Sequence, residues 1–320
     1  MNIKTNKNKY AIDINNTNNF IKKNLSSEIK LINDISFYLT DIGGKRIRPI
    51  LNIIFSKMLK NYTKQNTIMS SVVELIHTAT LLHDDVVDLS DKRRGTLTVN
   101  NIWGNKEAIL VGDFLYTKSF KMMTEIKNLE LLKLMANTTN IMSEGEIKQL
   151  NNIKNFNITE ETYLDIIRCK TAELFAATTL SSAILANADY KIKIMAYKYG
   201  LHFGIAYQLI DDILDYLSSD EKFGKNICDD ILNGTFTLPI IKFMHNDKKK
   251  KFIINTIIQQ SDIDLFKIRD LIINSDALDY TYKLALYHID KAKNALSIFN
   301  NSEFLNDALS LTDFIVNRKY

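Results

Sequence analysis

The sequence predicts an all-α fold, and three observations support that prediction. Only 10 Gly and 2 Pro occur among the 320 residues, so the turn formers on which sandwiches and barrels depend are scarce. Apolar residues recur at spacings of three and four over long windows, which is the period of a helix rather than of a strand. No repeat and no Pro- or Ser-rich linker divides the chain. We therefore expect one helical domain over residues 1–320, in which residues 1–25 are loosely ordered.

The expected elements follow from residues that end or begin helices. A helical pattern over 26–40 stops at Gly43, and Pro49 suits the first turn of the next helix. A strongly apolar helix is expected over 67–88. The remaining expected elements are a polar loop over 89–101, helices over 104–125, 129–150, 160–187 and 190–217, a second polar loop over 218–236 and a further helix from Pro239.

The charge pattern argues against a large nucleic-acid surface. With 41 Lys and Arg against 37 Asp and Glu, the net charge is only +4. Basic residues are dispersed apart from Lys248–Lys251, a run that we interpret as a solvated loop. Cys169 and Cys228 are far apart and have no CxxC partner, so neither a disulfide framework nor a zinc site is expected.

The sequence also predicts a protein that remains in the cytoplasm. Its N-terminal stretch, MNIKTNKNKYAIDINNTNNF, is polar and lacks the apolar segment of a signal peptide. No window reaches 18 uninterrupted apolar residues, about the number that a membrane-spanning helix requires. We expect at most a peripheral membrane contact.

Two clusters of Asp with identical spacing carry most of the functional information. The first Asp cluster is Asp84, Asp85 and Asp88, and the second Asp cluster is Asp211, Asp212 and Asp215. Residues i and i+4 share a helix face, so each cluster presents a pair of carboxylates that repel each other unless a cation lies between them. Oxygen ligands without His or Cys suit Mg²⁺ holding a phosphate-bearing substrate rather than zinc.

Basic residues follow both clusters, Arg93 and Arg94 after the first and Lys222 and Lys225 after the second. Arg binds phosphate oxygens through two parallel hydrogen bonds, and Lys supplies a point charge. One such cluster alone is usually a helix end with surface acids, but two matched clusters with flanking cations predict a diphosphate site.

Further residues extend this site, although each also has a purely structural interpretation. Lys45 and Arg48 lie on a Gly-rich turn that leads into a helix, a geometry that favours anions. Lys170 and Thr171 interrupt an apolar helix, where an anion must meet the ammonium; an internal Asp or Glu would serve as well as a substrate.

Two more polar residues share a helix face with an Asp cluster. His77 lies seven residues before Asp84, and Gln208 lies three residues before Asp211. Either can equally be a core residue whose polar atoms are satisfied within the protein.

Six motifs, in their order and spacing, resemble those of trans-polyprenyl diphosphate synthases. They are GGKRIRP, LLHDDVVDLSDKRRG, EGEIKQL, KTAELF, FGIAYQLIDDILDY and GKNICDDILNGTFTLP, and the match runs from about residue 40 to 243. The resemblance implies an isoprenoid-synthase bundle around a central apolar cavity, a homodimer and an enzyme that extends farnesyl diphosphate with isopentenyl diphosphate. It also implies an octaprenyl product for a quinone side chain.

The resemblance assigns roles residue by residue. Mg²⁺ is assigned to Asp84, Asp88 and Asp211, with Asp85, Asp212 and Asp215 supporting them in catalysis. Isopentenyl diphosphate is assigned to Lys45, Arg48, His77 and Arg94. The allylic diphosphate is assigned to Arg93, Lys170, Thr171, Gln208 and Lys225. Two departures, Cys228 and Thr235 where the family commonly has Gly and Lys, remove one cation from the second loop.

These residue types suit charge stabilisation rather than covalent catalysis. Mg²⁺ and the cations stabilise the negative charge on the departing diphosphate. The alkene of isopentenyl diphosphate then attacks the allylic cation and a proton leaves, so no side-chain nucleophile is required. The apolar helices must exclude water from the carbocation.

Product length is expected to depend on two small residues that precede the first Asp cluster by about one helical turn. Thr80 and Ala79 lie four and five positions before Asp84, about one helical turn away. By resemblance, short-chain synthases carry an aromatic residue here, so a long product is expected, with Met122 or Met123 lining the tunnel lower down. The alternative is that the small residues only let helices pack closely.

Four alternative functions remain. A shorter-chain synthase would make a farnesyl or geranylgeranyl product. A non-catalytic subunit of a heteromeric synthase usually has degraded Asp clusters, whereas both are intact here. A terpene cyclase would normally carry an Asn/Ser/Glu-type second cluster, and a basic RNA-binding helical protein would carry more positive charge.

Overall fold

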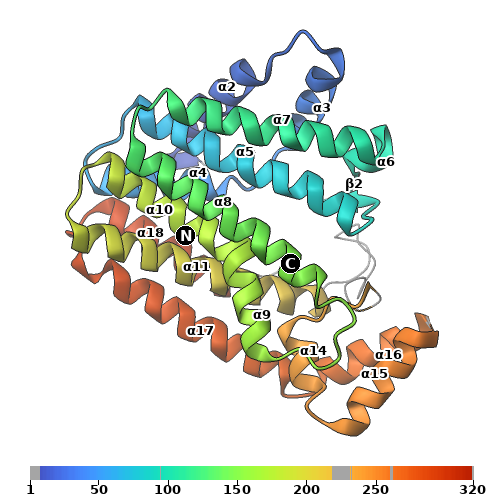
Figure 1. The fold of residues 1–320 in the computed structure, drawn as a ribbon. Coiled ribbons are helices and arrows are strands. Elements are labelled where there is room, and N and C mark those ends of the chain that lie inside the picture. Colours follow the sequence, from blue (N-terminus) through green and yellow to red (C-terminus); the bar gives the residue numbers. More distant parts are fainter. Residues whose placement is uncertain (1–7, 94, 218–230, 232, 260–261, 319–320) are drawn as a thin grey trace.

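The computed structural model describes residues 8–93, 95–217, 231, 233–259 and 262–318. These residues form helices joined by loops and one two-stranded hairpin, which confirms the predicted all-α class (Figure 1). The elements up to the middle of the chain are α2 (Ala11–Leu25), α3 (Lys30–Ile42), α4 (Ile47–Met58), α5 (Lys64–Val87), β1 (Lys92–Arg93), β2 (Thr96–Leu97), α6 (Val99–Trp103), α7 (Asn105–Thr124) and α8 (Leu129–Leu150).

The second half of the chain completes the bundle. Its elements are α9 (Glu160–Ile167), the π-helix η1 (Arg168–Ala172), α10 (Glu173–Leu185), α11 (Tyr190–Leu217), α14 (Leu238–Phe243), α15 (Asp247–Gln259), α16 (Asp262–Ile273), α17 (Ala277–Ala295), the 3₁₀-helix η2 (Leu296–Ile298) and α18 (Glu303–Val316). In Figure 1, α15 and α16 lie at one end of the molecule, beyond the long helices of the bundle.

Short-range chemistry fixes several helix ends. Asn128, Thr159 and Ser302 each accept a hydrogen bond from the backbone N–H three residues on and so begin α8, α9 and α18. As predicted, α3 ends at Gly43, whose φ of 67° is a conformation that favours glycine, and Pro239 lies at the start of α14.

The expectation that residues 1–25 are loosely ordered is wrong for residues 11–25. These residues form α2, and Ile14, Ile21 and Leu25 on one side of it are buried. α2 packs against α5 and α4, so the apolar stripe holds an otherwise Asn-rich segment on the bundle. Residues 1–7 lie outside the described part of the chain.

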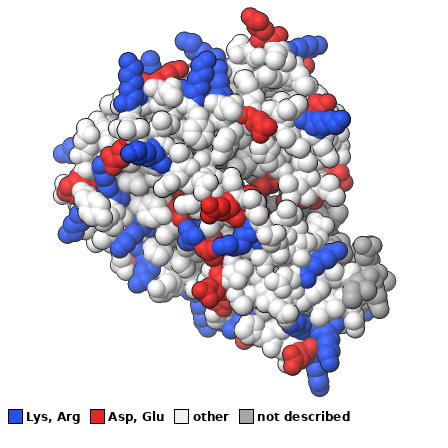
Figure 2. All heavy atoms as spheres, in the orientation of Figure 1, with Lys and Arg blue, Asp and Glu red and all other residues white. Residues whose placement is uncertain are grey.

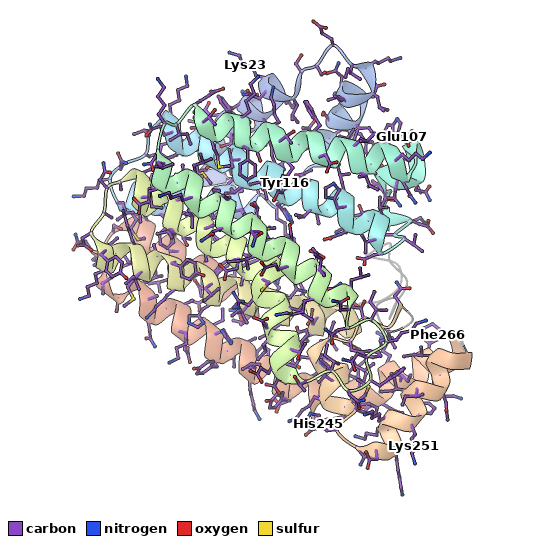
Figure 3. The ribbon with its side chains drawn as sticks, in the orientation of Figure 1. Lys23, Glu107, Tyr116, His245, Lys251 and Phe266 are labelled. Atoms are coloured by element: carbon purple, nitrogen blue, oxygen red, sulfur yellow. The ribbon has the colours of Figure 1, made fainter. Side chains whose placement is uncertain are left out.

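Three other local expectations need correction. The region expected to be a loop over 89–101 contains the β1–β2 hairpin and the start of α6, and the helix expected over 160–187 contains the π-helix η1. Lys248–Lys251 open α15 instead of forming a loop. Lys251 is exposed and lies on the outer side of α15 (Figure 3).

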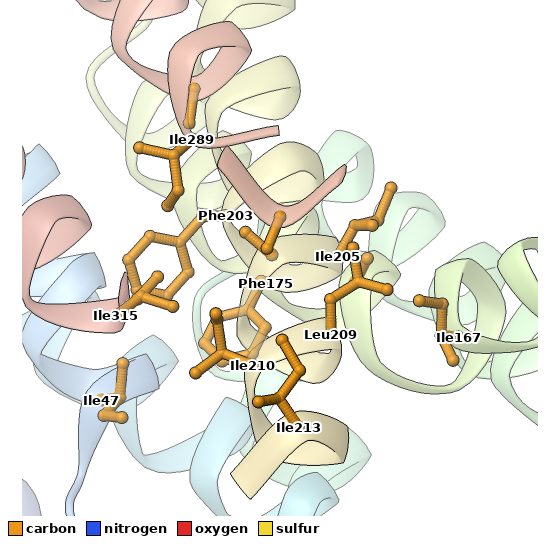
Figure 4. Packing of buried hydrophobic residues seen from close by; sticks show 14 of the residues in the cluster. Ile47, Ile167, Phe175, Phe203, Ile205, Leu209, Ile210, Ile213, Ile289 and Ile315 are labelled. Carbon is orange, nitrogen blue, oxygen red and sulfur yellow. The ribbon is translucent and has the colours of Figure 1, made fainter. Parts of the chain in front are cut away.

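The core consists of two buried apolar clusters on either side of α10. One includes residues of α4, α10, α11, α17 and α18. In it, the Phe175 ring of α10 packs against Phe203 of α11 with ring centroids 5.3 Å apart, next to Leu209 and Ile210 (Figure 4). α10 is almost completely buried on all sides, as expected for a helix between two cores.

The other cluster lies among α5, α7, α8 and α10 and is rich in methionine. Its buried side chains include Met69, Met122, Met123, Met135 and Met142. The unbranched thioether side chain adapts to irregular shapes, so this cluster can rearrange around an apolar guest more easily than a β-branched core. We refer to it below as the methionine cluster.

A histidine pair joins α11 to α17 and predicts a pH-dependent stability. Nδ1 of His202 lies 2.9 Å from Nδ1 of His288. Burial lowers the pKa of both rings, that of His288 to about 4, and the charges of Lys291 and Lys198 lower the pKa of His202 further. Because both pKa values lie below the ordinary value of 6.5, protonation favours the unfolded chain.

We therefore expect the melting temperature to fall as the pH drops from about 6.5 towards about 4, and His288→Phe to weaken that dependence. The measurement is the melting temperature across this range for wild type, for His288→Phe and for the exposed control His245→Gln. Parallel profiles for wild type and His288→Phe would show that the pair does not control acid stability.

Candidate active site

The two Asp clusters lie near the C-terminal ends of α5 and α11, which point toward the same end of the bundle (Figure 1). Asp84 and Asp88 are linked by the last helical hydrogen bond of α5, from Asp88 N to Asp84 O at 2.8 Å. Asp88 is exposed and Asp84 is half-buried. The first pair therefore projects from the end of α5 rather than from the middle of the core, and Asp211 and Asp215 are half-buried near the end of α11.

Asp84 occupies an environment that penalises its charge. Its pKa is raised to about 7: burial is the largest cause, the charges of Glu146 and Asp88 add to the rise, and the charges of Lys170 and Arg93 oppose it. Placing a divalent cation at Asp84 and Asp88 would offset both the burial and the repulsion between carboxylates. The electrostatics thus favour a cation at the first Asp cluster.

The middle Asp of each cluster is buried and bound to other protein groups. Asp85 is 4% exposed and its Oδ1 accepts hydrogen bonds from Arg93 Nε at 2.8 Å and Nη2 at 2.7 Å. Asp212 is 5% exposed; its Oδ1 accepts from Gln208 Nε2 at 2.9 Å and its Oδ2 from the Tyr163 hydroxyl. Both carboxylates thus support neighbouring side chains.

Asp211 meets a cation that the sequence reasoning missed. Its Oδ1 lies 2.8 Å from Nη1 of Arg318, which also stacks over the Tyr207 ring at 4.2 Å. Burial raises the pKa of Asp211, while Arg318, Lys45 and Arg48 act against that rise. The only sequence signal for Arg318 is its place in the C-terminal FIVNRKY segment, which by itself indicates no partner.

The π-helix η1 places Lys170 and Thr171 between the two clusters. Nζ of Lys170 donates to Gln149 Oε1 at 2.9 Å and lies 2.5 Å from Glu146 Oε2. The Thr171 hydroxyl donates to Gln208 Oε1 at 3.0 Å. Glu146 is therefore the internal acid that was considered as an alternative partner for Lys170. Short π-helical segments such as η1 recur at functional sites.

Two glycines allow η1 to fit between α8 and α11. A Cβ added to Gly145 would lie 2.6 Å from Cβ of Cys169, and one added to Gly204 would lie 2.6 Å from Cα of Ala172. Real Cβ atoms do not approach so closely, so only glycine lets both helices contact the π-turn.

Arg48 retains an unsatisfied donor near the second cluster. Its guanidinium lies 4.2 Å from the Phe175 ring centroid, and burial lowers its pKa to about 10. In the described part of the chain, its buried Nε has no hydrogen-bond partner. Such a donor is costly unless an anion reaches it, which fits a phosphate-bearing ligand.

His77 lies on the wall of a pocket between α3, α5 and the β1–β2 hairpin that is partly open to solvent. Two ion pairs line this pocket: Arg46 with Glu74, at 2.5 Å, and Arg93 with Asp85.

The predicted chain-length residues fall into two environments. Ala79 is completely buried in the methionine cluster, as are Met122 and Met123. Thr80 is half-buried, and its hydroxyl donates to the backbone oxygen of His77 at 2.9 Å. Ala79 therefore borders the apolar interior, and Thr80 lies on the helix face that leads to Asp84.

Three predicted cations, Arg94, Lys222 and Lys225, lie outside the described residues, as does Cys228. Lys45 is exposed and Thr235 is half-buried.

The donor set fits a magnesium ion that shares its ligands with a substrate. Over the described ranges, no three His, Cys, Asp or Glu side chains are grouped so that they could hold a metal by themselves. Mg²⁺ is commonly bound by one or two carboxylates, with water and phosphate oxygens completing its shell. The carboxylates of Asp84 and Asp88 match that requirement, and a bound diphosphate would supply the remaining oxygens.

No helix in the described part of the chain combines the length and the apolar character needed to cross a bilayer.

Comparisons with known proteins give one consistent result. The polyprenyl synthetase family model matches residues 29–272. Octaprenyl diphosphate synthase of Escherichia coli is 38% identical over 311 residues, which cover 96% of each chain.

Two solved structures are similar over nearly the whole chain. Polyprenyl synthase from Caulobacter crescentus, complexed with calcium and isoprenyl diphosphate, has a TM-score of 0.95 and 36% identity and covers 99% of this chain and 98% of that one. A decaprenyl diphosphate synthase from Rhodobacter capsulatus has a TM-score of 0.92 and 34% identity, with 98% of each chain covered. These likenesses confirm the helical bundle that the sequence resemblance implied.

Proposed function

This chain belongs to the polyprenyl synthetase family, and on that premise we propose that it is a long-chain trans-prenyl diphosphate synthase. It condenses isopentenyl diphosphate onto farnesyl diphosphate, and its product is an octaprenyl diphosphate that supplies a quinone side chain. The observation that carries this proposal is the pair of Asp clusters at one end of an apolar bundle, bridged by Lys170, Thr171 and Gln208.

We assign the site residues as follows. Asp84, Asp88 and Asp211 would hold Mg²⁺, which when bound neutralises negative charge on the diphosphate leaving group. The allylic diphosphate would contact Arg93, Lys170, Thr171, Gln208 and Lys225. Isopentenyl diphosphate would contact Lys45, Arg48, His77 and Arg94. The Nε of Arg48, which has no hydrogen-bond partner among the described residues, supports that placement.

The residues of the chain contribute orientation, charge and exclusion of water. The Lys170 ammonium, already held between Glu146 and Gln149, stabilises the diphosphate as the allylic C1–O bond breaks. The C4 alkene carbon of isopentenyl diphosphate bonds to that C1, and a proton leaves C2 for the released diphosphate. The methionine cluster encloses the growing chain and keeps water from the cation.

We also propose that the chain is a single domain, a homodimer and a cytoplasmic enzyme with no nucleic-acid partner. Ile109 and Leu110 on α7 are 42% and 68% exposed, a feature that suits burial against a second copy. Figure 2 shows Lys and Arg interspersed with Asp and Glu over the face in view, a distribution that favours neither DNA nor RNA.

The proposal is tested by incubating the purified protein with radiolabelled isopentenyl diphosphate, Mg²⁺ and geranyl, farnesyl or geranylgeranyl diphosphate in turn. We expect label in a butanol-extractable prenyl diphosphate only when a primer is present. Release of a hydrocarbon from the primer would indicate a cyclase, and absence of incorporation with every primer would indicate a non-catalytic subunit.

A further inference from the structure

Tyr163 is a buried tyrosine whose hydroxyl contacts the second Asp cluster. It lies on α9, is 3% exposed, and its hydroxyl donates to Oδ2 of Asp212. Burial and the charge of Asp212 raise its pKa well above the ordinary value, so the hydroxyl keeps its proton. Tyr163 is therefore a permanent donor to the second Asp cluster.

This hydrogen bond is the first in a relay that ends at η1. Asp212 Oδ1 accepts from Gln208 Nε2 at 2.9 Å, and Gln208 Oε1 accepts from the Thr171 hydroxyl at 3.0 Å. The relay thus connects three elements, α9, α11 and η1, through side chains that are buried or half-buried. The last member of the relay, Thr171, is adjacent in sequence to Lys170, whose charge lowers the pKa of Asp84.

The polarity of the relay is set at Asp212. An ionised carboxylate only accepts hydrogen bonds, so it requires the amide N–H of Gln208 to face it. The amide oxygen of Gln208 must then face Thr171, and the Thr171 hydroxyl must donate toward α11. If the Gln208 amide turned over, its oxygen would face the carboxylate and the relay would be broken.

Tyr163 keeps Asp212 in the state that this arrangement needs. Without the phenolic donor, a carboxylate that is 5% exposed would lose one of its hydrogen bonds. A buried carboxylate that loses one donor turns toward another donor. Asp212 then no longer fixes the orientation of Gln208, and Thr171 is no longer held.

We infer that Tyr163 is a positioning residue: through Asp212 and Gln208 it fixes the Thr171 hydroxyl at the place where the allylic diphosphate binds. This inference rests on the proposed function for the identity of that substrate. It distinguishes the two diphosphates, because the three hydrogen bonds of the relay lead from α9 through α11 to Thr171, a residue assigned to the allylic diphosphate.

The test is Tyr163→Phe, which removes one oxygen and keeps the buried ring. We expect kcat/KM for farnesyl diphosphate to fall about tenfold to about a hundredfold, as for a buried charged acceptor that loses a donor. The KM for isopentenyl diphosphate should stay within about twofold, since that site is not on the relay. The matched control is Tyr280→Phe. The Tyr280 hydroxyl also donates to a carboxylate of α9, to the Oε atoms of Glu160 at 2.9 Å, but Glu160 is at the opposite end of α9 from η1.

A double-mutant cycle separates positioning from a loss of stability. In an Asp212→Asn background there is no buried charge for Tyr163 to hold, so adding Tyr163→Phe should lower kcat/KM for farnesyl diphosphate no further. That comparison remains informative if Tyr163→Phe alone folds poorly. Additive losses in the cycle, or equal increases in the KM values of both substrates, would overturn the inference.

A binding measurement distinguishes failure of this inference from failure of the proposed function. Farnesyl diphosphate with Mg²⁺ should raise the melting temperature of wild type and of Tyr280→Phe, and should raise that of Tyr163→Phe much less. If wild type and Tyr280→Phe show this shift, Tyr163→Phe shows much less of it, and wild type transfers no prenyl group, the proposed reaction is wrong and the positioning role stands. An equal shift in all three proteins would contradict the positioning role.

Discussion

Replacing Asp84 with Ala is expected to lower turnover by about a thousandfold or more while leaving the protein folded. The carboxylate is half-buried beside Glu146 and Asp88, and burial raises its pKa to about 7, so its removal relieves an unfavourable charge rather than breaking a stabilising bond. The reaction, in contrast, loses half of the carboxylate pair that would hold the cation. The measurement is kcat at saturating substrates and Mg²⁺, together with the melting temperature.

The control for that experiment is Asp279→Ala, which removes an exposed carboxylate paired with the exposed Lys283 on α17. It should leave kcat within about twofold, because exposed ion pairs contribute little. A double variant of Asp84→Ala and Asp88→Ala with near-normal turnover would rule out the assignment of the metal to the first Asp cluster.

The second large effect is expected at Ala79, where a Tyr should shorten the product to the farnesyl or geranylgeranyl range. Ala79 is completely buried in the methionine cluster together with Met123, about one turn from Asp84. A phenol ring there would fill the space into which a chain anchored at Asp84 and Asp88 must extend. The neighbouring methionine side chains can adjust to the ring, so the first condensation should proceed.

Chromatography of the dephosphorylated products measures this effect. Ala11→Tyr is the matched control, because Ala11 is exposed at the start of α2 and the same side chain there should not change product length. If a folded and active Ala79→Tyr enzyme makes a product of wild-type length, the tunnel does not pass Ala79.

Periodicity and spacing predicted the helices and the Asp pairs because both depend on residues that are close in sequence. Asp84 and Asp88 share a face through one helical turn, and Gly43 ends α3 through its own backbone freedom. α2 was missed because many Asn residues mask its short apolar stripe of Ile14, Ile21 and Leu25. The same information could not separate Lys170 as a substrate ligand from Lys170 as a partner of Glu146, and the structure shows the latter contact.

Contacts between distant segments were not predictable from one sequence. The motif KTAELF continues an apolar helical pattern, and its π-turn depends on close approach by Gly145 and Gly204 from two other helices. Tyr163 is 49 residues from Asp212, and Arg318 approaches Asp211 from the C-terminal end of the chain. No local pattern marks either partner, since each side chain also suits an ordinary helix.

Product length from the wild-type protein tests the central claim most directly. Purified protein would be incubated with farnesyl diphosphate and excess isopentenyl diphosphate, with and without Mg²⁺. The molecular masses of the dephosphorylated products would then be measured by mass spectrometry. The account predicts octaprenol as the main product with Mg²⁺ and no elongation without it. Geranylgeraniol as the final product, or elongation that does not depend on a divalent cation, would contradict it.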